Sequence, residues 1–154
     1  MPIRTTIRVE GLRQLDAALK ELPKAAGKAV LRRVGIKALE PFDKAWREKA
    51  PHLTGELEES GGIGTRLTKR QARLKRKRGG KAYVEVYAGP NNPASVPQEF
   101  GTHDQKAQPF ARPAWDETST EALVIVETEL GGEIDRTAQR LARRALRLAK
   151  RGGR

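Results

Sequence analysis

The chain has 154 residues, the size of one domain, and its 31 Lys and Arg outnumber its 19 Asp and Glu, which gives a formal net charge of +12. Hydrophobic residues make up 37% and aromatic residues 5%, so the core must be modest and mostly aliphatic, and a thin core favours assembly into an oligomer. The absence of cysteine excludes disulfides and thiolate metal sites. The charge calls for an anionic partner, which is nucleic acid, an acidic protein or an anionic membrane.

Neither a secretion signal nor a membrane span is expected. The first residues, 1–6, contain no apolar run of the kind that directs secretion. No stretch of the chain approaches the roughly 20 apolar residues that are needed to cross a bilayer. We therefore expect a soluble chain that is cytoplasmic where it is made and has no membrane partner.

The N-terminal third is expected to be mainly helical. Alternation of apolar and polar residues over 3–9 predicts a short strand. Apolar residues at three- and four-residue steps then predict a short helix over 12–22 and a long one over 24–50. Pro23 fits the start of the long helix, and Pro41 should kink or restart it, because proline lacks an N–H and restricts the backbone.

The middle of the chain predicts a small sheet with a basic arm. A loop is expected over 51–60, followed by a glycine-rich strand over 61–67. The segment 82–88 alternates cleanly and predicts the second strand, which ends in a turn at 89–93. Between the two strands, the run from about 66 to 81 contains no acidic residue and predicts a basic hairpin arm.

Two functional interpretations of this arm stay open beside a third, in which it is only a solvated tip. Its cations can neutralise phosphates, which gives sequence-independent and salt-sensitive binding, or they can meet an acidic protein neighbour. Base stacking is not expected, since no aromatic residue is interleaved. The candidate contacts to DNA or to an acidic partner are Arg70, Arg73, Lys75, Arg76, Lys77 and Arg78.

The C-terminal part is expected to be an irregular, proline-rich segment over 96–114, followed by a long helix from about 118 to 150. The pair Gly131-Gly132 should loosen or bend this helix. Together the elements predict a single α+β domain over 1–154. In it, a small antiparallel sheet is packed by a long bent N-terminal helix and a long C-terminal helix, with the basic hairpin arm attached.

No catalytic constellation is visible in the sequence. The only histidines, His52 and His103, lie in predicted loops. His103 stands beside Asp104 and near Glu99, but this spacing is far from that of known metal sites. These residues are more simply explained as parts of a polar surface loop. The glycines at 61–64 lack the Lys-Ser/Thr of a phosphate loop. We therefore expect a non-enzymatic protein with no metal and no cofactor.

The most informative stretch surrounds Phe100 and Phe110, two rare aromatics flanked by Gly or Pro. We interpret both rings as anchors that pin an irregular segment onto the core. Pro109 and Pro113 restrict φ around Phe110 and reduce the entropy of ordering the segment. This suits a rigid contact surface, the alternative being a well-packed loop. The predicted assembly motif consists of Glu99, Phe100, Gly101, Thr102, Pro109, Phe110, Arg112 and Pro113.

Four phrases follow one another along the chain: GLRQLDAALKELPK at 11–24, APHLTGELEES at 50–60, EFGT at 99–102 and QPFARPA at 108–114. In this order they resemble the small neck or tail-completion proteins of long-tailed phages, the family of gene product ten of HK-type siphophages and of the lambda tail completion protein Z. The chain departs from the family at Glu58 and Glu59, where an aromatic or basic residue is usual, and its basic run is longer.

The resemblance implies a structural head–tail connector in the virion neck, made in the cytoplasm of a bacterial host. Identical subunits would form a closed ring between the portal-side connector and the tail tube, with double-stranded DNA passing through the lumen. The implied symmetry is six-fold, with twelve-fold as the alternative, and the implied neighbours are head-completion or connector and tail-tube proteins.

The alternative function is that of a small basic nucleic-acid-binding protein of ribosomal or chromatin-like type. The cluster of acids from Asp116 to Asp135 makes the charge bipolar along the chain. A bipolar charge favours attraction between subunits over uniform coating of DNA.

Overall fold

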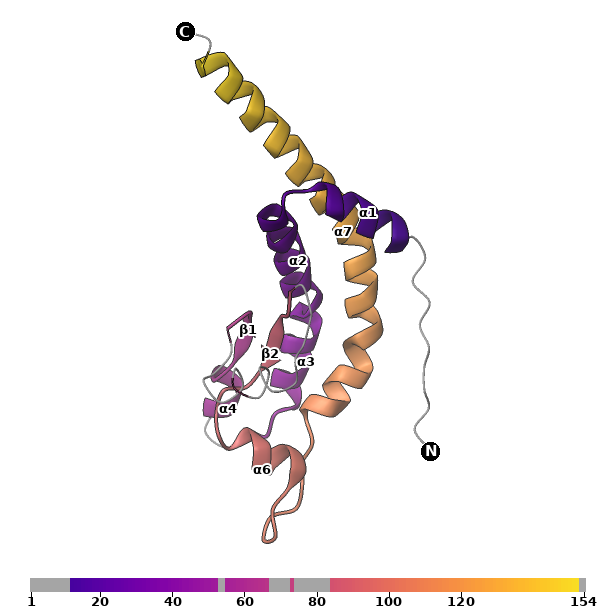
Figure 1. The fold of residues 1–154 in the computed structure, drawn as a ribbon. Helices are drawn as coiled ribbons and strands as arrows, with labels where there is room; N and C mark the ends of the chain where they lie inside the picture. The colour runs from indigo at the N-terminus through magenta and orange to yellow at the C-terminus, as the bar shows by residue number, and fades with distance from the viewer. Residues whose placement is uncertain (1–11, 53–54, 67–72, 74–83, 153–154) are drawn as a thin grey trace.

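The computed structural model describes residues 12–52, 55–66, 73 and 84–152, and it confirms the α+β class (Figure 1). The elements are α1 (Leu12–Glu21), α2 (Lys24–Ala38), α3 (Glu40–Lys49), α4 (Glu56–Glu59), β1 (Gly62–Gly64), β2 (Tyr87–Gly89), α6 (Ser95–Phe100) and α7 (Ala111–Gly152). The strand predicted over 3–9 and most of the basic arm lie outside the described residues. That the whole chain forms one domain stays a prediction.

The bend in the long N-terminal helix lies where the sequence places it. Helix α2 begins directly after Pro23, and α3 begins one residue after α2 ends, with Pro41 in its first turn. Proline is tolerated there because the first N–H groups of a helix have no partner within the helix. Leu39 joins the two helices, and its carbonyl accepts a hydrogen bond from the N–H of Asp43 at 2.9 Å.

Helix α7 starts at Ala111, earlier than the predicted start near 118, because the carboxylate of Glu99 accepts hydrogen bonds from its first N–H groups. It runs through Gly131 and Gly132 without interruption and changes direction where α1 crosses it (Figure 1). The side chain of Leu15 in α1 lies close to Gly131, where a Cβ would come within 3.6 Å of Leu15 Cδ2.

Gly131→Ala is expected to stabilise the fold by about 0.5–1 kcal/mol, because a helical glycine loses more backbone entropy than alanine and the added methyl has room. Urea denaturation measures the change. A destabilised variant would show that the curvature of α7 beside α1 depends on glycine.

The core consists of two clusters that both use α7. The first contains Trp46 and Phe42 of α3, Leu57 of α4, and Phe110 and Ala114 at the start of α7. In the second, apolar residues of α2 pack on α7 further along, and the leucines of α1 cover them. The buried residues of the second cluster are Val30, Val34, Leu130 and Ile134.

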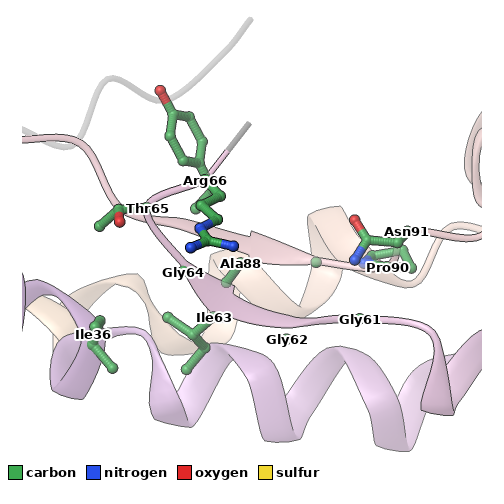
Figure 2. A pocket seen from close by; sticks show the side chains of 12 residues that line it. Ile36, Gly61, Gly62, Ile63, Gly64, Thr65, Arg66, Ala88, Pro90 and Asn91 are labelled. Atoms are coloured by element: carbon green, nitrogen blue, oxygen red, sulfur yellow. The ribbon is translucent and has the colours of Figure 1, made fainter. Parts of the chain in front are cut away.

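The sheet is antiparallel, with Ile63 opposite Ala88, but its strands are shorter than the predicted 61–67 and 82–88. Val86 lies against α2 instead of pairing, since a Cβ on Gly35 would approach Val86 Cγ2 within 2.7 Å, and Val84 lines an apolar hollow together with residues of α2 and α7. The alternation in 82–88 therefore reflects packing on a helix as well as strand pairing. Beside the sheet lies a hollow of about 520 Å³, lined by Ile36 and by residues of both strands (Figure 2).

Candidate assembly site

The carboxylate of Glu99 caps the N-terminus of α7. It accepts hydrogen bonds from the backbone N–H groups of Phe110 at 2.8 Å, Ala111 at 2.9 Å and Arg112 at 3.1 Å. The first N–H groups of a helix lack partners within the helix, and the positive end of the helix dipole favours an anion. An N-cap residue normally precedes its helix directly in the sequence, whereas here a side chain from α6 accepts these hydrogen bonds.

Arg112 closes the same arrangement from the other side. Its Nε donates to Glu99 Oε1 at 2.8 Å, and its Nη2 donates to the backbone carbonyl oxygen of Glu99 at 3.0 Å. The guanidinium carbon lies 4.9 Å from the centre of the Phe100 ring. We call this set of contacts between Glu99, Arg112 and the start of α7 the clasp.

The clasp keeps Glu99 ionised although its side chain is buried. Burial by itself raises the pKa of Glu99, but the hydrogen bonds from Arg112 and from the three backbone N–H groups together outweigh it and hold the pKa below its ordinary value of 4.5. A carboxylate with this many donors stabilises the folded state for as long as it stays ionised.

The loop that follows, 101–108, is tied to itself and to α6. Gly101 has φ +75°, and a Cβ there would lie 2.9 Å from both Gln105 O and Ala107 N, so the turn requires glycine. Thr102 N–H donates to Gln105 O at 2.9 Å, and Gln105 N–H donates to Thr102 Oγ1 at 3.1 Å. Gln108 N–H donates to Gln98 O at 2.8 Å and closes the loop at its base.

The two predicted anchors behave differently. The prediction for Phe110 is confirmed, since it is 1% exposed and its ring centre lies 6.1 Å from that of Trp46. The prediction for Phe100 is wrong, because its side chain is 64% exposed. The reason is geometric. Glu99 turns inward to reach α7, so its neighbour Phe100 on the short helix α6 turns outward, together with Val96 one turn earlier.

The structure brings the predicted assembly motif together at one end of the molecule, where α6, the loop 101–108 and the start of α7 meet (Figure 1). Pro109 is exposed and Pro113 is half-buried in the first turn of α7. The predicted contacts of the basic arm to DNA or to an acidic partner stay predictions. Arg73 is described and exposed, whereas Arg70, Lys75, Arg76, Lys77 and Arg78 lie outside the described residues.

No protein-family model, curated protein or solved structure matches this chain.

A second polar network, which sequence reasoning missed, holds the segment after α3. Arg47 Nε pairs with Asp43 Oδ2 at 2.8 Å, and its guanidinium donates to the backbone carbonyls of Glu58 and Gly61. The guanidinium carbon also lies 4.7 Å from the centre of the Trp46 ring. The four-residue spacing of Asp43 and Arg47 on a predicted helix was the available signal, but the carbonyl partners come from α4 and from Gly61, which directly precedes β1.

The described residues contain little that resembles a reaction centre. No group of three His, Asp or Glu side chains within them is placed to hold a metal ion. Among the described residues, Arg66 is the only charged side chain that lines the hollow beside the sheet. His103 pairs with Asp104 at 2.8 Å in the exposed loop. None of the described helices combines the length and apolar character that crossing a bilayer requires.

Proposed function

We propose that this chain is a structural subunit of the neck of a tailed phage, which forms a ring that joins the portal-side connector to the tail tube and lets DNA pass. The proposal is supported mainly by the arrangement of side chains at the end of the molecule formed by α6 and the loop 101–108. There the clasp fixes a short helix whose outward face carries exposed apolar side chains.

The outward face of α6 has the properties of a contact surface. Val96 is 62% exposed and lies one helical turn from Phe100, so the two side chains share a face. Glu99 between them is 5% exposed and fully hydrogen-bonded, which limits the freedom of α6 before any partner arrives. A preorganised surface loses less conformational entropy on binding, and aromatic and arginine side chains often dominate interface energetics.

The charge distribution also supports assembly from identical subunits. The part of α7 before Arg136 carries five exposed acids, which are Asp116, Glu117, Glu121, Glu127 and Asp135. Because the chain as a whole is strongly basic, this acidic stretch can meet cations of another subunit, and such heterologous contacts close into rings when the rotation permits. A small basic nucleic-acid-binding protein, the alternative, would not need an apolar contact face held in place by a buried carboxylate and its exposed arginine partner.

The ring and the role of α6 are tested together by mass measurement across a range of salt concentrations. We expect the wild-type protein, alone or with its neighbouring neck proteins, to form one closed species of several 17.0 kDa subunits, with six as the preferred number. Phe100→Ala should shift this species toward monomers that are still folded, as circular dichroism would show.

The matched control is Leu146→Ala, since Leu146 is 64% exposed, as Phe100 is, but lies on the far part of α7. It should leave the ring intact. A wild-type protein that stays monomeric both alone and with its neighbours would contradict the proposed function. A ring that Phe100→Ala does not disturb would contradict the role of α6.

A further inference from the structure

The final part of α7 stands apart from the rest of the described chain. Beyond the crossing with α1 the helix extends alone (Figure 1), and every residue from Ala142 to Arg151 is exposed. No acidic residue occurs between Arg136 and Arg151. The positive charge of this segment is therefore not neutralised by acidic residues of its own.

Its cations lie on one side of the helix. At about 100° per residue, they all fall within an arc of roughly 120°. We call this arc the cationic face. Its members are Arg136, Arg140, Arg143, Arg144, Arg147, Lys150 and Arg151. The opposite side carries Leu141, Ala145 and Leu148, which continue the direction of the buried Leu130 and Ile134.

Most of the cationic face has no acidic partner within the described residues. Arg136 pairs with Glu133 at 2.8 Å, and Arg140 donates to Thr137 Oγ1 at 2.9 Å. By contrast, the cations of the helices that pack together are largely matched, as Arg33 is with Glu133 and Lys37 with Glu129. The five cations from Arg143 onward form no ion pair with a described residue.

We propose that the cationic face binds the phosphates of double-stranded DNA. The cations from Arg136 to Arg151 span about 22 Å at 1.5 Å per residue, an average of about 3.8 Å from one to the next, which is comparable to the axial spacing of about 3.4 Å between phosphates along one DNA strand. Six of the seven are arginine, whose fork of N–H donors suits phosphate oxygens.

An acidic protein surface fits the same face less well. No apolar or aromatic side chain of 136–151 lies within the arc, whereas the centre of a protein interface is depleted in charge and enriched in aromatic residues. Phosphate binding requires no apolar contact and is driven by release of counterions. This proposal depends on the proposed function only for its biological context, in which DNA passes through the ring.

The test compares three full-length proteins on a fluorescently labelled 24-base-pair duplex of arbitrary sequence, by anisotropy between about 50 and 200 mM salt. The first variant carries R140Q, R143Q, R144Q and R147Q. The control carries R13Q, K20Q, R32Q and K44Q, which remove the same charge from exposed positions on α1, α2 and α3. Glutamine preserves helix propensity, and the basic run 66–81 is unchanged in all three.

We expect the first variant to lose about tenfold or more in affinity at 100 mM salt. Its slope of log K against log salt should also be smaller than that of the wild type by about 3 to 4, close to 0.9 for each lost phosphate contact. The control should lose much less affinity and keep most of the slope. Equal losses in both variants would overturn the proposal, because they would show a response to net charge alone.

A mass measurement on the same samples separates this inference from the proposed function. A ring that persists in the first variant while DNA binding falls supports the proposal. Normal DNA binding with loss of the ring would overturn it and assign the cationic face to the acidic surface of a neighbouring subunit. If the wild type never forms a ring but the first variant still loses DNA binding, the proposed neck function is contradicted and DNA binding by the cationic face is supported.

Discussion

Phe110→Ala is expected to lower the free energy of unfolding by about 3–5 kcal/mol, the range for removal of a fully buried aromatic ring. The Phe110 ring packs against Trp46 of α3 and sits at the first turn of α7, in the cluster that also holds α4. Its loss would leave a cavity where three elements meet, and Trp46, itself fully buried, would lose a neighbour.

Chemical denaturation at neutral pH measures the change, and Phe100→Ala is the matched control from the same motif. Because the Phe100 ring is exposed and contacts mainly the guanidinium of Arg112, its removal should change the free energy of unfolding by less than about 1 kcal/mol. Similar destabilisation by the two substitutions would contradict the assignment of Phe110 to the core and Phe100 to the contact surface.

Glu99→Ala is expected to destabilise the protein by about 3 kcal/mol at neutral pH. Three backbone N–H groups at the start of α7 would lose their acceptor, and each buried, unpaired donor is unfavourable by about 1 kcal/mol or more. Glu99→Gln retains one acceptor oxygen, so its free energy of unfolding should lie between those of the wild type and Glu99→Ala. Glu117→Ala, which removes an exposed partner of Lys49, should change stability by less than about 1 kcal/mol.

The contribution of Glu99 should also depend on pH in a defined direction. Because the pKa of Glu99 is lowered in the folded state, its stabilising effect is fully present above the ordinary value of 4.5 and is lost as the pH falls through the folded pKa. The difference in unfolding free energy between wild type and Glu99→Gln should therefore be constant from pH 6 to 8 and shrink below about pH 4.5. A difference that grows on acidification would contradict the clasp.

Local patterns were sufficient to predict much of the helical framework. The three- and four-residue spacing of apolar side chains marks α1, α2, α3 and most of α7, because one face of each packs against another helix. The positions of Pro23 and Pro41 identify the helix starts, since proline acts on its own backbone and on the preceding turn. The cationic face of α7 is likewise a matter of residue spacing on a regular helix.

Only the tertiary structure decided how the assembly motif works. Phe100 and Phe110 have similar flanking residues, and what separates them is that Glu99 reaches across to α7 and turns Phe100 outward. The start of α7 at Ala111 depends on a cap donated by α6, a partner twelve residues away in sequence from Ala111, so no local signal marks it. Val84 and Val86 alternate as a strand does, but Val86 packs on α2 and Val84 lines the apolar hollow between α2 and α7, because burial of an apolar side chain requires an apolar neighbour and not a particular kind of element.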